Sequence, residues 1–162
     1  MAFCTRVPNA AGVRFHVVAQ LPYVVVMRDN DPLATLPALR LENLAGRPMA
    51  FTRAPAYNAS ISRLLRHYNI TPIVHSNAND DAALFGVVRS GVAIFITCDY
   101  PQLYSNGLAI RPLEQDYCRR EICLAYTEKS LAGPGGELAR YAIDKTDPEI
   151  PHNRVVQERD ES

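Results

Sequence analysis

The sequence lacks an excess of charge of either sign. Seventeen Lys and Arg residues balance seventeen Asp and Glu residues, so the formal net charge is zero. Nucleic acid and anionic lipid attract proteins through clustered basic residues, whose binding releases counterions from the phosphates. The balance predicts that this chain makes no direct contact with nucleic acid and none with a membrane.

Long apolar runs are also missing. No run is longer than that at residues 23–27, which is far shorter than the roughly 20 residues that a membrane-spanning helix needs. The first eight residues lack the apolar centre of a secretion signal. The sequence therefore predicts neither secretion nor membrane insertion, and a cytoplasmic location.

The cysteines lack the C-x-x-C spacing that binds zinc or cycles as a redox dithiol. The chain contains four of them, Cys4, Cys98, Cys118 and Cys123. The histidines add no ligand spacing either. We expect reduced, mostly buried thiols, no metal site and no cofactor.

Known catalytic motifs are absent as well. The sequence has no G-x-S-x-G, no H-E-x-x-H and no glycine-rich phosphate loop after a strand. One pair of residues suits thiolate catalysis, Cys98 with His75 at the ends of two predicted strands. Alternation along the strand points His75 away from Ser76, and an isolated cysteine is usually a small core residue. We predict that the chain is not an enzyme.

What the sequence does contain is an α/β pattern. Of its 162 residues, 48% are hydrophobic and 21% charged, the balance of an ordinary globular domain. Three strand-then-helix units are typical of a parallel sheet with helices on its faces. These units are predicted at 48–52 with 56–68, at 72–76 with 80–89, and at 92–97 with a short helix from Pro101.

Further elements flank these units. Strands are predicted at 2–5, 13–19, 22–27, 108–112 and 122–126, a helical passage at 37–45, a loop at 131–136 and a helix at 137–143. From Asp144 onward the chain is polar and contains two prolines, which predicts a disordered tail.

Polar side chains gather where the predicted parallel strands end. In open α/β sheets, ligands bind beyond the carboxyl ends of the strands. The candidates there are Thr52, Arg53, Ser76, Asn77 and Thr97. Short hydroxyl and amide groups with one guanidinium suit a small polar or carboxylate ligand.

Each candidate also has a purely structural explanation. In that alternative, Thr52 and Ser76 only end strands, and Asn77 or Asn79 caps the following helix. Asp80 and Asp81 argue against an anion bound at that helix terminus, since they already interact with its dipole.

The order of these segments resembles the effector-binding domain of LysR-type transcriptional regulators. Local phrases carry the resemblance: Asp31-Pro32-Leu33-Ala34, Leu41-Glu42-Asn43-Leu44-Ala45-Gly46-Arg47-Pro48, Val87-Val88-Arg89-Ser90-Gly91-Val92-Ala93-Ile94, and Gly107-Leu108-Ala109-Ile110-Arg111-Pro112-Leu113. Two positions depart from the family pattern. Asn30 or Asp31 stands where histidine is common, and Ala93 replaces a glycine.

The resemblance implies a type 2 periplasmic-binding-protein-like fold, with a Rossmann-like lobe and parts of a second lobe. Residues 1–143 would form the domain. Its parts would be an incomplete first lobe at 1–21 and 127–143, a second lobe at 28–118, and crossover strands at 22–27 and 119–126, followed by the tail at 144–162. An inducer would lie between the lobes, contacting Thr5 as well as the second-lobe candidates.

The resemblance also implies a function. We expect a ligand-sensing regulatory domain that binds a small-molecule inducer and acts as a homodimer or homo-oligomer. The family's winged helix-turn-helix and linker helix have no counterpart here, so the chain looks like a C-terminal piece that reaches DNA only through a missing N-terminal domain. The alternative is a stand-alone small-molecule-binding or protein-interaction module.

Overall fold

The computed structural model describes residues 1–6, 10–53, 55–78, 80–105, 107–115 and 118–146. They form two compact units. The first contains Met1–Leu21 and the described residues from Arg120 onward, and the second contains Pro22–Arg119. None of the described helices is long and apolar enough to cross a membrane.

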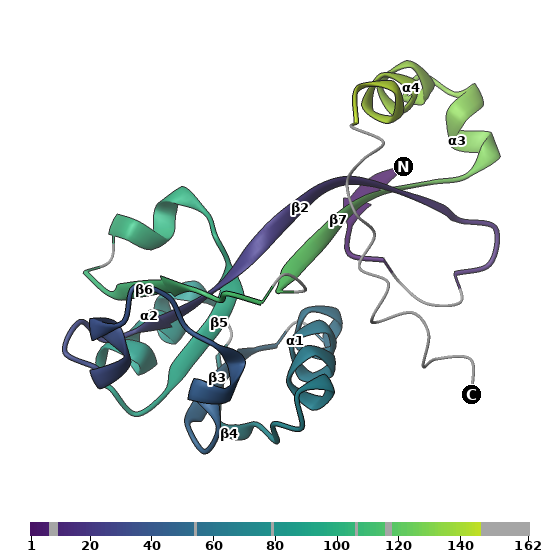
Figure 1. The fold of residues 1–162 in the computed structure, drawn as a ribbon. Coiled ribbons are helices and arrows are strands. Elements are labelled where there is room, and N and C mark those ends of the chain that lie inside the picture. The colour runs from purple at the N-terminus through teal and green to yellow at the C-terminus, as the bar shows by residue number, and fades with distance from the viewer. Residues whose placement is uncertain (7–9, 54, 79, 106, 116–117, 147–162) are drawn as a thin grey trace. The chain divides into compact units, whose positions relative to one another are not determined.

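The first unit combines a small antiparallel sheet with two helices. Strand β1 (Ala2–Cys4) pairs with β7 (Arg119–Tyr126), and β7 is followed in sheet order by β2 (Arg14–Met27). Helices α3 (Glu128–Ala132) and α4 (Gly136–Lys145) pack against each other after β7 (Figure 1). A Cβ atom at Gly136 would lie 1.9 Å from the Leu131 carbonyl oxygen, so glycine is required at this junction.

The second unit is built on a mixed sheet. Its order is β6 (Ala109–Pro112), β2, β5 (Ile94–Cys98), β3 (Pro48–Thr52) and β4 (Ile73–Ala78). The first three strands are antiparallel neighbours, and the last three are parallel. Residues 23–27 of β2 are all buried, as expected for a β-branched run in a central strand.

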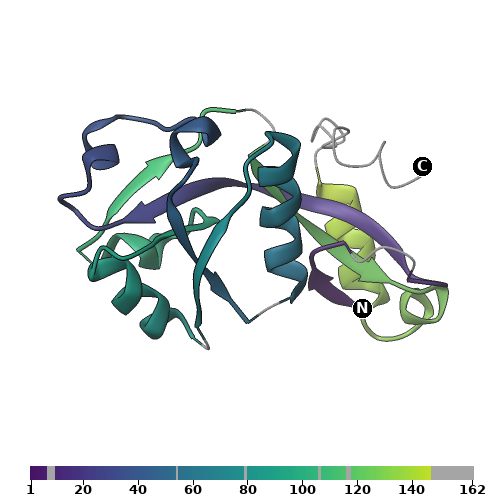
Figure 2. The same ribbon diagram turned by 90° about the horizontal axis from the view of Figure 1, so that it is seen from below.

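Two helices cover this sheet (Figure 2). The apolar face of α2 (Asp81–Arg89) packs with Ala50 of β3 and Phe95 of β5 in one core cluster. Helix α1 (Pro55–His67) follows β3, and its predicted stripe is buried at Ile61, Leu64 and Leu65. This arrangement confirms the α/β architecture that the hydrophobic pattern predicts.

Several sequence-based boundaries are wrong. The strands predicted at 13–19 and 22–27 are one continuous strand, β2. Pro22 does not interrupt it, because proline lacks only the N–H donor, and the Pro22 carbonyl oxygen still accepts a hydrogen bond from Asp99 N at 2.9 Å. The passage at 37–45 contains only the 3₁₀ turn η2 (Leu41–Leu44), after η1 (Pro32–Thr35). A third turn, η3 (Pro101–Ser105), does begin at Pro101.

The helix ends also differ from expectation. The N-cap of α2 is Asp80, whose carboxylate accepts from Ala83 N at 2.8 Å, whereas Asn77 lies within β4. Asn79 lies outside the described residues, as does the tail from residue 147 on. Helix α4 reaches Lys145, so the chain stays helical past the predicted start of the tail at Asp144.

Candidate functional site

The parallel strands of the second unit bring several predicted site residues to one edge of the sheet. In the register of β3 and β4, Ala50 pairs with Ser76, Phe51 with Asn77, and Thr52 with Ala78. The carboxyl ends of the two strands therefore coincide. For Ser76 and Asn77, the structure gives the position of the backbone in β4 and not that of the side chain.

Thr52 is held by the first turn of α1. Asn58 Nδ2 donates to the Thr52 carbonyl oxygen at 2.6 Å, and the Thr52 hydroxyl donates to Asn58 Oδ1 at 3.2 Å. This reciprocal pair fixes the turn from strand to helix and orients the Thr52 hydroxyl. Asn58 was not predicted from the sequence, where it reads as one polar residue on an amphipathic helix.

The other two second-unit candidates differ in exposure. Arg53 is exposed just beyond β3, where its guanidinium can meet a ligand. Thr97 is 6% exposed and pairs with Val24 of β2, so its side chain is buried in the unit. The structure thus brings Thr52 and Arg53 to the strand end and places Thr97 in the interior.

The Cys98 and His75 pair is not assembled. Strand β3 lies between β4 and β5, so the two residues are on strands that are not neighbours. Cys98 is 5% exposed, and His75 is exposed at a bulge in β4. This geometry offers no thiolate and base pair.

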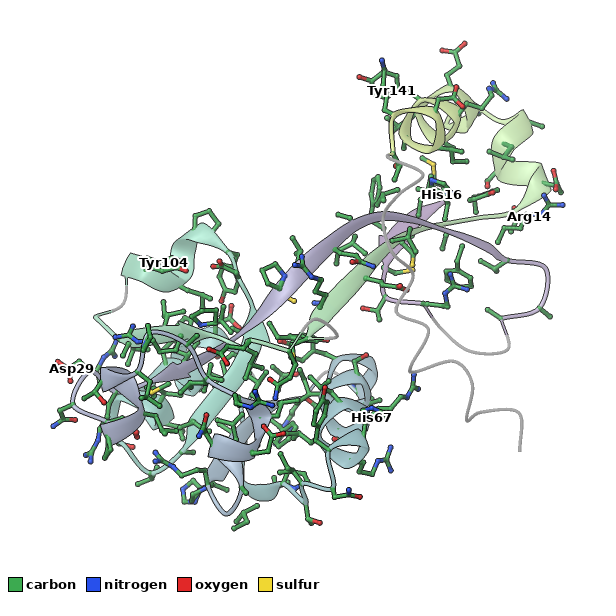
Figure 3. All side chains as sticks on the ribbon, viewed as in Figure 1. Arg14, His16, Asp29, His67, Tyr104 and Tyr141 are labelled. Carbon is green, nitrogen blue, oxygen red and sulfur yellow. The ribbon has the colours of Figure 1, made fainter. Side chains whose placement is uncertain are left out.

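Acids and tyrosines occupy the rest of this edge. Burial of Tyr100, followed by the nearby carboxylate of Asp81, raises the pKa of the phenol. Tyr104, labelled in Figure 3, donates to Asp99 at 3.0 Å, and desolvation followed by this hydrogen bond raises the pKa of Tyr104 in the same way. The phenol groups had no sequence signal, because they follow a strand without any periodic pattern.

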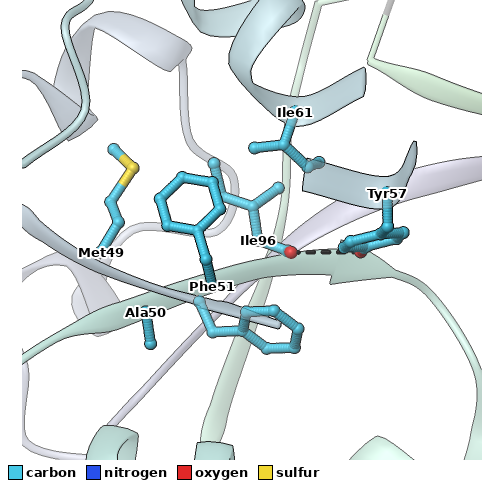
Figure 4. A pocket seen from close by; sticks show the side chains of 7 residues that line it. Met49, Ala50, Phe51, Tyr57, Ile61 and Ile96 are labelled. Carbon is cyan, nitrogen blue, oxygen red and sulfur yellow. Dashed lines mark hydrogen bonds between the residues drawn. The ribbon is translucent and has the colours of Figure 1, made fainter. Parts of the chain in front are cut away.

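A small cavity lies between β3, β5 and α1. Its empty volume, counted together with the open solvent at its mouth, is about 200 Å³. The residues that line it are apolar apart from Tyr57. The Tyr57 hydroxyl donates to the Ile96 carbonyl oxygen at 3.2 Å (Figure 4). Met49, Phe51 and Ile61 line the cavity as well. This lining suits packing of the core better than it suits a polar ligand.

The first unit presents a separate polar group at the end of β1. Arg120 of β7 donates two hydrogen bonds to the Thr5 hydroxyl oxygen, from Nε at 3.1 Å and from Nη2 at 2.8 Å. The Arg6 guanidinium lies over the Phe15 ring, 5.9 Å from its centroid. A hydroxyl and a guanidinium together form a recognition group for carboxylates.

Arg120 is the functional candidate that the sequence interpretation missed. In the sequence it belongs to Arg119-Arg120-Glu121, which looks like a solvated charged face. Its contact with Thr5 spans 115 positions and depends on the pairing of β1 with β7. No local pattern encodes that contact.

Within the described residues, no group of three or more His, Cys, Asp or Glu side chains is placed to hold a metal ion. All four cysteines are free thiols.

Comparisons with known proteins agree with this picture. The family model described as the LysR substrate binding domain matches residues 1–139. Among curated proteins, none matches this sequence.

Solved structures with the same fold include the effector binding domain of QuiR in complex with shikimate, at 22% identity and a TM-score of 0.77 over 88% of this chain and 69% of that one. A second is the C-terminal domain of a probable LysR family regulator from Rhodococcus, at 17% identity and a TM-score of 0.70, covering 88% and 71%. A third is the BenM effector binding domain with benzoate, at 15% identity and a TM-score of 0.66, covering 78% and 60%. These TM-scores establish a shared fold, the type 2 periplasmic-binding-like architecture.

Proposed function

This chain belongs to the LysR substrate binding domain family, and on that premise we propose that it is a ligand-sensing regulatory domain for a small carboxylate effector. The observation that carries the proposal is the contact of Arg120 with Thr5. A guanidinium has five N–H donors and a planar geometry that matches a carboxylate. The group at the end of β1 is suited to orient such an effector.

The ligands of similar domains support this chemistry. The QuiR domain is described with shikimate and the BenM domain with benzoate, and both molecules are small carboxylates. In this chain, Thr52 and Arg53 are consecutive residues that supply a hydroxyl and a guanidinium at the end of β3. We include Thr52, Arg53, Ser76 and Asn77 as second-unit candidates, and leave out Thr97 because it is buried.

The proposed mechanism is a shift of conformational populations. An effector that binds one arrangement of the domain more tightly increases its population by its differential affinity. A homodimer would pass that change to DNA-binding domains carried elsewhere. The reduced thiols fit a cytoplasmic setting.

Calorimetry with benzoate and shikimate, each compared with its amide, tests the proposal. Arg120→Ala removes a charge-assisted contact worth about 1.5–3 kcal/mol, so affinity for the carboxylate should fall roughly 10- to 100-fold. Arg119→Ala is the matched control, because Arg119 is the neighbour of Arg120 on β7 and its side chain is exposed. Unchanged affinity in folded Arg120→Ala would contradict the proposed role.

A second candidate function is a protein-interaction module. Leu138 and Tyr141 on α4 are 54% and 62% exposed, which is unusual for large apolar side chains on one helix. Thermal unfolding separates the two functions. A true effector at 100 times its Kd stabilises the fold by about 2.7 kcal/mol, whereas a module that needs no effector shows no such shift with any carboxylate.

A further inference from the structure

Two thiols face each other across the first pair of strands. The antiparallel register of β1 and β7 places Cys4 directly opposite Cys123. Directly paired residues in such strands project to the same face, with Cα atoms about 4.5–5.5 Å apart. That spacing lies within the range of about 4.4–6.8 Å that a disulfide spans.

The two thiols differ in access. Cys4 is half-buried, whereas Cys123 is 0% exposed. Burial raises the pKa of the Cys123 thiol, although the charge of the nearby Arg6 acts against this effect. An external reagent therefore meets Cys4 first, and Cys123 is placed to react with whatever forms on Cys4.

We propose that Cys4 and Cys123 form a reversible disulfide by exchange with a low-molecular-weight disulfide such as oxidised glutathione. This proposal goes beyond effector binding and does not depend on it. No local sequence pattern indicates this pair, because the two residues are far apart in the chain and become neighbours only through strand pairing.

The exchange proceeds in two steps. The Cys4 thiolate attacks one sulfur of the small disulfide, forming a mixed disulfide on Cys4 and releasing one small thiol. Cys123 then loses its proton and attacks the Cys4 sulfur, forming the intramolecular bond and releasing the second small thiol. Two protein thiols are oxidised, and one small disulfide is reduced to two thiols.

The remaining cysteines provide an internal control. Tyr23 of β2 pairs with Cys98 on one side, and its N–H donates to the Cys118 carbonyl oxygen on the other. Cys98 and Cys118 therefore lie about two strand spacings apart, roughly 9–10 Å. A disulfide cannot bridge that distance without backbone movement.

Equilibration of the purified chain with mixtures of reduced and oxidised glutathione tests the proposal. We expect two of the four thiols to be lost together and to return with dithiothreitol. Trypsin places Cys4 on peptide 1–6 and Cys123 on peptide 121–129, while Cys98 and Cys118 share peptide 90–119. Mass spectrometry should find 1–6 joined to 121–129, with 90–119 still carrying two free thiols.

Two variants separate the steps. Cys123→Ser should retain one glutathione on Cys4, whereas Cys4→Ser should leave Cys123 unmodified because no reagent reaches it. The wild-type peptide map decides the matter even if a variant does not fold. A stable mixed disulfide on wild-type Cys4, a covalent dimer, or no oxidation at all would each overturn the proposal.

Discussion

The carboxylate of Asp31 accepts a hydrogen bond from the guanidinium of Arg47, and it also accepts one from Leu33 N at 3.0 Å. Asp31 is 5% exposed. Burial alone would raise its pKa, but the hydrogen bond from Arg47, the bond from Leu33 and the charges of Arg47 and Arg28 together lower it. The ionised form is therefore built into the folded second unit.

This pair predicts sensitivity to acid. Because the folded-state pKa lies below the ordinary value of 3.8, the stabilisation is present above that value and is lost as the pH falls through the folded pKa. Asp31→Asn keeps an acceptor for Leu33 but removes the charge. It should cost about 1–2 kcal/mol at pH 7, less than a fully buried pair, because Arg47 is 30% exposed.

Urea unfolding between pH 3 and pH 7 measures this effect, with Asp29→Asn as the matched control. Asp29 is exposed (Figure 3), and it accepts a hydrogen bond from Asn30 N at 2.8 Å. The control should stay within about 0.5 kcal/mol of the wild type. Equal losses in both variants would show that the Arg47 contact contributes nothing.

Two glycines should respond in opposite directions to alanine. Gly91 has φ +76°, and a Cβ atom there would lie 2.6 Å from atoms of the Arg28 side chain. Gly91→Ala should therefore cost about 1–2 kcal/mol or more. Gly86 lies in α2 with nothing within 4 Å, so Gly86→Ala should stabilise by about 0.5–1 kcal/mol. Thermal unfolding of both variants checks the signs, and a neutral Gly91→Ala would be the contradicting result.

Two tyrosine hydroxyls provide another matched comparison. The Tyr57 hydroxyl donates to Ile96 O in a partly buried site, whereas the Tyr104 hydroxyl donates to Asp99 on the surface. Tyr57→Phe leaves the Ile96 carbonyl without that donor and should cost about 1 kcal/mol. Tyr104→Phe should change the free energy of unfolding by less than about 0.5 kcal/mol. Denaturant titration at neutral pH measures both, and the reverse order would refute the assignment.

Cys118 predicts a loss of stability in alkali. Burial, followed by the nearby charge of Glu42, raises the pKa of its thiol from 9.0 to about 12. The unfolded chain loses this proton first, so stability should decline as the pH rises from about 9 to about 12. The slope contributed by one proton is about 1.4 kcal/mol per pH unit.

The free energy of unfolding, measured at several pH values above 8 for the wild type and for Cys118→Ala, tests this slope. The variant lacks the thiol, so its stability should fall less steeply with pH, whatever its starting stability. Tyr100 and Tyr104 contribute a decline of the same sign in both proteins. Parallel curves would mean that Cys118 titrates alike in both states.

Local sequence signals predicted much of the second unit. Strand β3 has the predicted bounds, 48–52, because an apolar run there is delimited by Pro48 and by polar residues. The stripe on α1 is buried as its helical spacing indicates. Such features depend on neighbours within one turn or one strand, which the sequence displays directly.

The features that were missed have one of two causes. Either the contact joins residues that are far apart in the chain, or an unusual residue type fills a position in a known local motif. Helix α3 begins with a reciprocal pair between Thr127 and Ser130, in which each side chain accepts from the other's N–H. This is a capping box with Ser130 at the position where the motif usually has glutamate, so the sequence does not show the usual capping-box pattern. The Arg120 contact with Thr5 requires the β1 and β7 register, which no local pattern contains. Thr5 and Thr52 stay predicted site residues, and the sequence did not indicate the side chains that hydrogen-bond to them, Arg120 and Asn58.

The position of β2 in the chain has a consequence for folding. Val24 is flanked by Thr97 of β5 and Pro112 of β6, both of which come much later in the chain. Such distant pairings slow folding and leave apolar segments uncovered in the meantime. During synthesis, residues 23–27 must wait until β6 has been made before both of their edges are paired. Refolding yield should therefore fall as protein concentration rises, because uncovered copies of this stretch can meet one another first.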